Sequence, residues 1–210
     1  MTAFTTAADP VTLRAVARDV GLASSAVYRY VASRDELLTL LIVDAFTSLG
    51  DAVDEALARR PRARPETRFR TVATTMRAWA LEHPHQYALV YGSPVPDYHA
   101  PAERTTPAGT RVQARLVEIL ADLRPDLPRS TRARRALGPM LADEMFTGSG
   151  VSPELLERGL AAWHLVLGTI SSEVFGQLGP DTISDPGALF DGVVELAFGL
   201  VRADPRAPGR

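Results

Sequence analysis

The sequence predicts an all-α protein, and two observations carry this prediction. Apolar residues recur at three- and four-residue spacing along almost the whole chain, which is the period of a helix with one buried face. No stretch alternates apolar and polar residues for long enough to form a strand. The length of 210 residues and the hydrophobic fraction of 46% are ordinary for a globular protein with a sizeable core.

The first part of the chain contains three helical segments and a connector. Glycine lets a backbone turn sharply, and Gly21 divides the first two segments. Pro61 and Pro65 follow the third segment, and proline does not continue a helix. These observations predict helices at about 11–20, 24–31 and 35–57, followed by a connector at 59–65.

The remainder of the chain predicts further helices separated by proline-containing breaks. Pro84 ends one helix and precedes a short helix through Tyr87 and Tyr91, after which the chain is rich in proline. The predicted elements are helices at about 66–82, 108–123, 130–146, 153–178 and 186–202, and an irregular loop at 93–101.

Composition excludes several classes of protein and site. The absence of cysteine excludes disulfides, thiolate zinc sites and a cysteine nucleophile, and it favours a reducing cytoplasm. No apolar run is long enough to cross a bilayer, and Met1–Pro10 lacks the features of a signal peptide. The net charge of -2 means that any contact with nucleic acid must come from a local cluster. We therefore expect a cytoplasmic protein with no membrane partner.

One segment near the N-terminus has the pattern of a helix-turn-helix. Leu13, Val16 and Ala17 make the inner face of its first helix, and Leu22 with Val27 pins the second helix across it. The outward positions of the second helix carry short side chains and hydrogen-bond donors but no acid. The segment therefore predicts a DNA-binding unit whose second helix enters a major groove.

This segment and the start of the next helix also match a known pattern. The matching residues, in register and without a gap, are Thr12, Arg14, Val16, Ala17, Val20, Gly21, Val27, Tyr28, Tyr30, Arg34, Glu36, Leu37 and Leu38. With these residues the sequence resembles the TetR family of bacterial transcriptional regulators. The resemblance implies an N-terminal helix-turn-helix domain at 1–47 and a C-terminal helical ligand-binding and dimerisation domain at 48–204.

The same resemblance implies roles for individual residues. Thr12 and Tyr30 would hold phosphates, Arg34 would reach the DNA backbone, and the residues from Ser24 to Arg29 would face base edges. The DNA-binding set implied in this way is Thr12, Ser24, Ser25, Ala26, Tyr28, Arg29, Tyr30 and Arg34.

Two features depart from the family's pattern. Ala23 stands where the family has a helix-capping serine, so either Ser24 caps the recognition helix or the cap is lost, at a cost of about 1 kcal/mol. Family members place a helix before the Thr12 position, whereas Met1–Pro10 leaves that first helix short or missing. Either the true start lies upstream, or the DNA-binding unit is incomplete. The alternative function is therefore an N-terminally truncated member that binds ligand and dimerises without binding DNA.

A second resemblance lies near the C-terminus. It rests on Trp163, Gly168, Glu173, Phe175, Gly176 and Leu178. These residues are similar to a signature of TetR ligand-binding domains that is called the WHG type, so the two resemblances together cover most of the chain.

Aromatic and methionine residues of the C-terminal region form the candidate ligand pocket, because such pockets combine aromatic walls with a few polar groups. For each residue alone, core packing is the competing interpretation, and His164 can equally satisfy a buried carbonyl. The candidate residues are Phe69, Met76, Trp79, Tyr87, Tyr91, Met140, Met145, Phe146 and His164.

The last two helices each carry two apolar or small-residue faces, which implies two partners for each helix. The last helix has one row with Leu189, Val193, Leu196 and Leu200, and another with Phe190, Val194, Ala197 and Val201. One row of each helix serves the core and the other a second subunit. The residues predicted to form the dimer interface are Ala161, Gly168, Ser172, Gly176, Val194, Ala197 and Val201.

The sequence contains no catalytic constellation, so we expect a protein that is not an enzyme and that uses no cofactor. His83 and His85 lack an acidic or cysteine partner at ligand spacing, and we expect no metal site. The function predicted is a homodimeric regulator, a repressor that a small apolar or aromatic effector releases from its double-stranded DNA operator.

Overall fold

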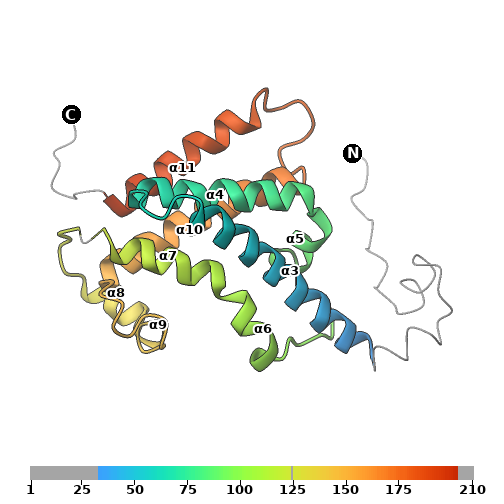
Figure 1. The fold of residues 1–210 in the computed structure, drawn as a ribbon, viewed down its shortest axis with the longest axis horizontal. Helices are drawn as coiled ribbons and strands as arrows, with labels where there is room; N and C mark the ends of the chain where they lie inside the picture. The colour runs from blue at the N-terminus through green and yellow to red at the C-terminus, as the bar shows by residue number, and fades with distance from the viewer. Residues whose placement is uncertain (1–32, 124, 203–210) are drawn as a thin grey trace.

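The computed structural model describes residues 33–123 and 125–202 (Figure 1). All regular secondary structure in these ranges is helical, which confirms the all-α prediction. The helices are α3 (Arg34–Ala58), α4 (Pro65–Glu82), α5 (Pro84–Tyr91), α6 (Ala102–Gly109), α7 (Arg111–Ala121), α8 (Thr131–Ala136), α9 (Gly138–Leu141), α10 (Pro153–Val174) and α11 (Pro186–Arg202). Within these ranges, no helix combines the length and the apolar character that a bilayer crossing requires.

The structure differs from the predicted helices in three places. The helix predicted at 130–146 is two short helices, α8 and α9, because Gly138 and Pro139 interrupt it. The helix predicted at 153–178 ends at Val174, and Gly176 then adopts the left-handed φ of 60° that glycine tolerates. The helix α6 was not predicted, since it carries an internal proline, Pro107.

Helix α3 begins with a clear capping signal. Ser33 precedes the helix in an extended conformation, and its side chain accepts a hydrogen bond from the backbone N–H of Glu36 at 3.1 Å. Asp35 and Glu36 place negative charge in the first turn, where the helix dipole favours it. The helix then runs through the middle of the molecule and packs on α4, α5, α6 and α7 (Figure 1).

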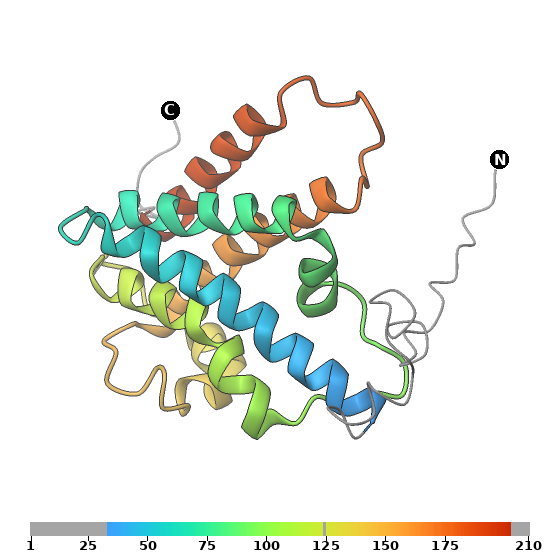
Figure 2. The same ribbon diagram turned by 45° about the vertical axis from the view of Figure 1, so that its right-hand side comes forward.

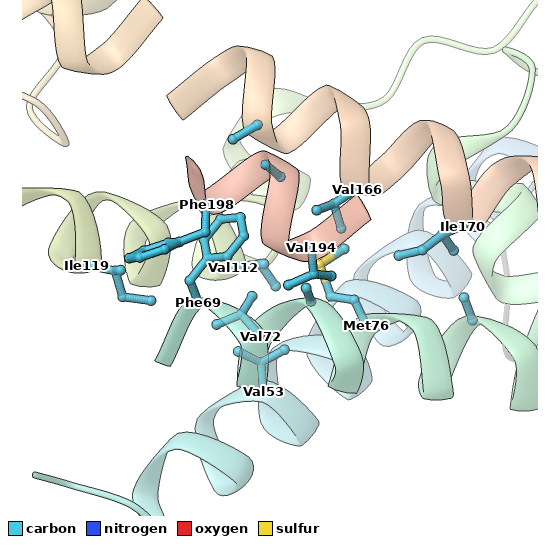
Figure 3. Packing of buried hydrophobic residues seen from close by; sticks show 14 of the residues in the cluster. Val53, Phe69, Val72, Met76, Val112, Ile119, Val166, Ile170, Val194 and Phe198 are labelled. Carbon is cyan, nitrogen blue, oxygen red and sulfur yellow. The ribbon is translucent and has the colours of Figure 1, made fainter. Parts of the chain in front are cut away.

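A single hydrophobic core joins the long helices (Figure 3). Five of its members show how far it extends: Val53 comes from α3, Met76 from α4, Ile119 from α7, Ile170 from α10 and Val194 from α11. Helices α10 and α11 make the most extensive contact between any two helices of the described ranges. The core therefore holds α3 and α4 against the α10–α11 pair.

An ion pair reinforces the contact between α4 and α10. Arg77 on α4 donates from Nε and Nη2 to the two carboxylate oxygens of Glu173, at 2.7 and 2.6 Å. The same guanidinium group lies 5.3 Å from the ring centroid of Phe190 on α11. Both charged side chains are largely covered, so the pair fixes three helices relative to one another.

A second set of charges anchors the C-terminal half of α3 to α7. Asp54 accepts hydrogen bonds from Arg111 Nη2 and Arg115 Nε, both at 2.7 Å. Arg111 also pairs with Asp51 at 2.8 Å. A Cβ atom at Gly50 would lie 2.9 Å from Arg111 Nε, so glycine at this position lets the guanidinium group lie across α3.

The pKa of Asp54 is lowered from its usual value of 3.8. The largest cause is the hydrogen bond from Arg115, and Arg111 adds to it, while partial burial opposes both. A carboxyl group whose pKa is lower in the folded state contributes stability above its unfolded pKa. That contribution is lost as the pH falls through the folded-state pKa.

We therefore expect Asp54→Asn to lower the free energy of unfolding by about 1–2 kcal/mol at pH 7, since two charge-assisted hydrogen bonds are weakened. The difference from wild type should shrink as the pH falls below about 4. Urea unfolding at pH values from 7 to 3 measures both effects. The matched control is Glu55→Gln, which breaks an exposed pair with Arg59 and should change stability by less than about 0.5 kcal/mol. A deficit in Asp54→Asn that stays constant over this pH range would contradict the assignment.

Candidate functional site

Most of the predicted DNA-binding residues lie outside the described residues: Thr12, Ser24, Ser25, Ala26, Tyr28, Arg29 and Tyr30. Arg34 is the exception. It is the first residue of α3, and its Nη1 lies 4.0 Å from the Asp35 carboxylate. The family pattern ends in the first turns of α3, at Arg34, Glu36, Leu37 and Leu38. These residues therefore belong to the same helix that packs in the core.

The N-terminal half of α3 is attached to α6 and to the loop before it. Arg104 on α6 donates to both carboxylate oxygens of Glu36, at 2.7 and 3.0 Å. Thr39 donates its single hydroxyl proton to the carbonyl oxygen of Asp35. The hydroxyl of Tyr98, 2.8 Å away, is therefore the donor in its bond with Thr39. These contacts connect the start of α3 to α6 and to the loop between α5 and α6.

Four of the predicted pocket residues belong to the core instead: Phe69, Met76, Trp79 and Tyr87 are at most 5% exposed. The indole nitrogen of Trp79 donates to Ser48 at 3.0 Å, and the Tyr87 hydroxyl shares a hydrogen bond of 2.8 Å with Ser171. Packing encloses the rings of these four residues and both polar atoms are satisfied within the chain, so their place in a ligand pocket stays a prediction.

Three other predicted residues do line a common cavity. Met140, Phe146 and His164 come together between α7, α9 and α10 around a space of about 240 Å³. The remaining lining residues are Gln113, Leu116, Val117, Leu120, Leu156, Gly159, Leu160 and Trp163. We call this space the α7–α10 cavity. Its walls are mainly apolar, as in sites for small organic molecules.

Two polar side chains line the α7–α10 cavity. His164 is exposed at its edge. The side-chain oxygen of Gln113 is buried and has no hydrogen-bond partner within the described part of the chain. Sequence reasoning missed Gln113 because a glutamine on an amphipathic helix carries no distinctive pattern.

The last two predicted pocket residues do not line the cavity. Met145 is half-buried and is not among the lining residues. The ring centroid of Tyr91 lies 6.4 Å from that of Trp163, a lining residue, and 6.0 Å from that of Phe46 on α3. Burial raises the pKa of Tyr91, so its hydroxyl stays neutral in the physiological range. Tyr91 thus connects the cavity wall to α3.

The predicted dimer face is partly wrong. Val194, Ala197 and Val201 are at most 1% exposed, because they face the core between α4 and α10 (Figure 3). The opposite row of α11 is open to solvent, and Leu196 is 70% exposed. On α11, the row predicted to face a second subunit is therefore the buried row, and the other row is exposed. The exposed large apolar residues of α10 and α11 are Leu165, Leu189, Leu196 and Leu200.

The small residues predicted on α10 and beyond it lie nearer to solvent. Ala161, Gly168 and Gly176 are exposed, and Ser172 is partly covered. Together with the four exposed leucines they form a surface of α10 and α11 that we call the α10–α11 face. An exposed apolar surface of this kind is typical of a protein–protein contact.

Comparison with known proteins agrees with this architecture. Residues 69–197 match the family described as the tetracyclin repressor-like C-terminal domain. The chain is 40% identical over 206 residues to the HTH-type transcriptional regulators Mb1846 of Mycobacterium bovis and Rv1816 of Mycobacterium tuberculosis, and the matches cover 91% of this chain and 83% of each relative.

Two solved structures resemble the fold. The crystal structure of the regulatory protein SCO4313 gives a TM-score of 0.71 at 29% identity, and the match covers 90% of this chain and 85% of that chain. A protein from Rhodococcus sp. RHA1 gives a TM-score of 0.58 at 22% identity, over 94% and 86% of the two chains, which supports the fold alone. The family match spans more than half of the chain and the curated relatives are regulators, so this protein belongs to the TetR family of transcriptional regulators.

Proposed function

We propose that the chain is a ligand-responsive DNA-binding regulator, a repressor that a small apolar or aromatic effector releases from its operator. The observation that carries this proposal is the placement of α3. One helix begins with the last residues of the family pattern and then packs in the core beside α4 and α7. A change in the core can therefore reach the DNA-binding segment through a single rigid element.

The α7–α10 cavity is the proposed effector site. An apolar cavity of about 150 Å³ holds benzene, so a space of about 240 Å³ suits a molecule with one or two rings. Gln113 and His164 are polar side chains in its lining, so a molecule that carries a polar group beside its rings fits best. No charged side chain lines the cavity, which favours a neutral effector.

The effector would act by shifting a population of conformations. It must bind the conformation released from DNA more tightly than the DNA-bound one, since equal affinity for both would shift nothing. The aromatic contacts from Trp163 through Tyr91 to Phe46 give a continuous path from the cavity wall to α3.

A homodimer would use the α10–α11 face. A two-fold axis brings the same surface of each subunit together, so an exposed row of leucines beside small residues can pack against its own copy. Two DNA-binding units would then contact half-sites about one helical turn of DNA apart.

We expect Leu196→Glu to prevent dimer formation, because it would place two carboxylates close to each other in an apolar interface. Sedimentation velocity of the purified variant should give the mass of one chain, whereas the wild type should give the mass of two. Leu81→Glu, which changes an exposed leucine of α4, is the control and should remain dimeric. An unaltered dimer of Leu196→Glu would rule out the α10–α11 face as the interface.

DNA binding is tested by a fluorescence-anisotropy titration of the full chain against the DNA that flanks its own gene. We expect saturable binding that weakens steeply with salt, as for about six phosphates neutralised per dimer. Arg29→Ala should weaken this binding at least tenfold through loss of a base contact. Arg135→Ala, on the exposed side of α8, should leave it unchanged.

Absence of binding by a folded wild-type dimer would contradict this proposal as far as the given chain is concerned. It would favour the alternative of a ligand-binding dimer that does not bind DNA. Repeating the titration with the upstream in-frame codons added would then separate a missing first helix from a true loss of DNA binding.

A further inference from the structure

The connector between α3 and α4 carries a concentration of positive charge. It consists of residues 59–64, and four of these residues are exposed arginines: Arg59, Arg60, Arg62 and Arg64. No acidic residue lies among them. The chain as a whole has a net charge of -2, so this excess of positive charge is local. We call this segment the arginine connector.

Most of the charge on the arginine connector is uncompensated. The guanidinium groups without a hydrogen bond or ion pair in residues 33–123 and 125–202 are those of Arg60, Arg62 and Arg64. The acidic residues that flank the segment are already occupied, Glu55 by Arg59 and Glu66 by Arg202. By contrast, every arginine of α4, α6 and α7 takes part in an ion pair.

A second arginine-rich segment, residues 129–135, is better compensated. Arg132 pairs with Glu157 at 2.9 Å. The carboxylates of Asp126 and Glu154 line a cleft together with two further arginines of this segment. The two segments contain the same number of arginines, but acidic side chains offset the charge of the second one.

Backbone hydrogen bonds hold the arginine connector in tight turns. The N–H of Arg60 donates to the carbonyl oxygen of Leu57, and that of Ala63 to the carbonyl oxygen of Arg60, both at 3.0 Å. Behind the segment is a space of about 260 Å³ that Arg59, Arg60 and Arg70 line together with Ala56, Thr67, Thr71 and Thr74. Arg70 is already paired with two carboxylates of α11. No acidic residue lines this space, so a phosphate group beside Arg60 meets no opposing carboxylate there.

The arginine connector lies far from the start of α3. Figure 2 shows it at the left end of the molecule, directly after the end of α3, whereas α3 begins at the lower right. An α-helix rises 1.5 Å per residue, so the 25 residues of α3 separate its two ends by about 37 Å. A DNA duplex that passes the start of α3 is therefore too far away to contact the connector as well.

The composition of the arginine connector favours nucleic acid over protein as its partner. Protein interfaces are anchored by buried aromatic and large apolar side chains. Apart from arginine, residues 59–64 contain only proline and alanine. A phosphate backbone needs no such anchor, because it is bound by charge and by hydrogen bonds from arginine, whatever the base sequence.

We propose that the arginine connector is a second DNA-binding surface, which contacts the phosphate backbone of a double-stranded DNA segment other than the operator. The inference goes beyond the proposed function, since it requires neither the effector nor the residues of the helix-turn-helix pattern. A regulator bound at its operator then holds a second segment of DNA at its opposite end.

The test removes the uncompensated charge from the connector. The variant carries Arg60→Gln, Arg62→Gln and Arg64→Gln, and the first control replaces the same three residues with lysine, which keeps the charge. Fluorescence anisotropy of the full-length proteins with a short duplex of random sequence is measured at about 50 to 200 mM salt. The glutamine variant should bind at least tenfold more weakly, with a salt slope smaller by about two to three, whereas the lysine variant should match the wild type.

A second control separates a local contact from the charge of the whole chain. It carries Arg129→Gln, Arg134→Gln and Arg135→Gln, which removes the same number of charges from exposed positions of the better compensated segment. We expect it to keep the wild-type salt slope. Circular dichroism checks that every variant is folded. An equal loss in this control and in the connector variant would overturn the inference, and so would an unchanged slope in the connector variant.

An acidic protein is the competing class of partner. A polyglutamate peptide in place of the duplex tests it, and we expect the wild type to bind this peptide at least tenfold more weakly than the duplex. Binding of the peptide as tight as that of the duplex would overturn the assignment to DNA. Absence of salt-dependent duplex binding by the folded wild type would overturn it as well.

A sandwich measurement distinguishes this inference from the proposed function. The DNA that flanks the gene is immobilised, and capture of a fluorescent random duplex is measured with each protein. The connector variant should retain its affinity for the immobilised DNA but lose capture of the second duplex. Capture equal to that of the wild type would overturn the inference and leave the regulator proposal intact. If the wild type does not bind the flanking DNA, the proposed function fails, and the random-duplex titration alone decides the inference.

Discussion

The carboxylate of Asp54 fixes the helix on which the proposed regulation depends. It accepts from Arg111 and Arg115 of α7, both at 2.7 Å, and so holds the C-terminal half of α3 against the body of the molecule. Val53 beside it is fully buried in the common core. Charge-assisted hydrogen bonds and apolar packing coincide on the same turn of the helix, which makes this end of α3 the fixed end.

The other half of α3 is attached in a different way. The carboxylate of Glu36 is paired with one arginine, Arg104, whereas that of Asp54 is paired with two. A single exposed pair contributes at most about 1 kcal/mol. Leu40 and Leu41 on this half are also exposed in the described ranges. The α7–α10 cavity approaches this half through Tyr91, whose ring packs against Trp163 and against Phe46 of α3. The helix therefore combines a fixed end with a more weakly attached end, which is the end that the proposed effector would displace.

Periodicity predicted the helices well and their partners poorly. The spacing of apolar residues gave the class and the approximate bounds of α3, α4, α7 and α11, because it reports which residues share a face. It does not report which of two apolar faces turns inward. Both rows of α11 are apolar, and only packing on α4 shows that the row of Val194 is buried and that of Leu196 is not.

The same limit applies to the candidate site. The sequence placed Trp79 among the pocket candidates and Trp163 only in the C-terminal signature, but Ser48 satisfies the Trp79 indole inside the core, whereas Trp163 lines the α7–α10 cavity. The partners of Asp54 and Thr39 are 57 to 61 residues away in the sequence. Local pattern carries no information about such pairs. The helix-turn-helix pattern, by contrast, is local, and the family was indicated by its resemblance to the TetR pattern.

Native-state amide hydrogen exchange along α3 tests the central claim most directly. With the ligand-free full chain and no DNA, the account predicts strong protection from about Leu49 to Leu57 and markedly faster exchange from about Leu37 to Ile42. This gradient would identify the Asp54 end as the fixed end of the helix. Uniform protection along α3, or faster exchange at the Asp54 end, would contradict the account.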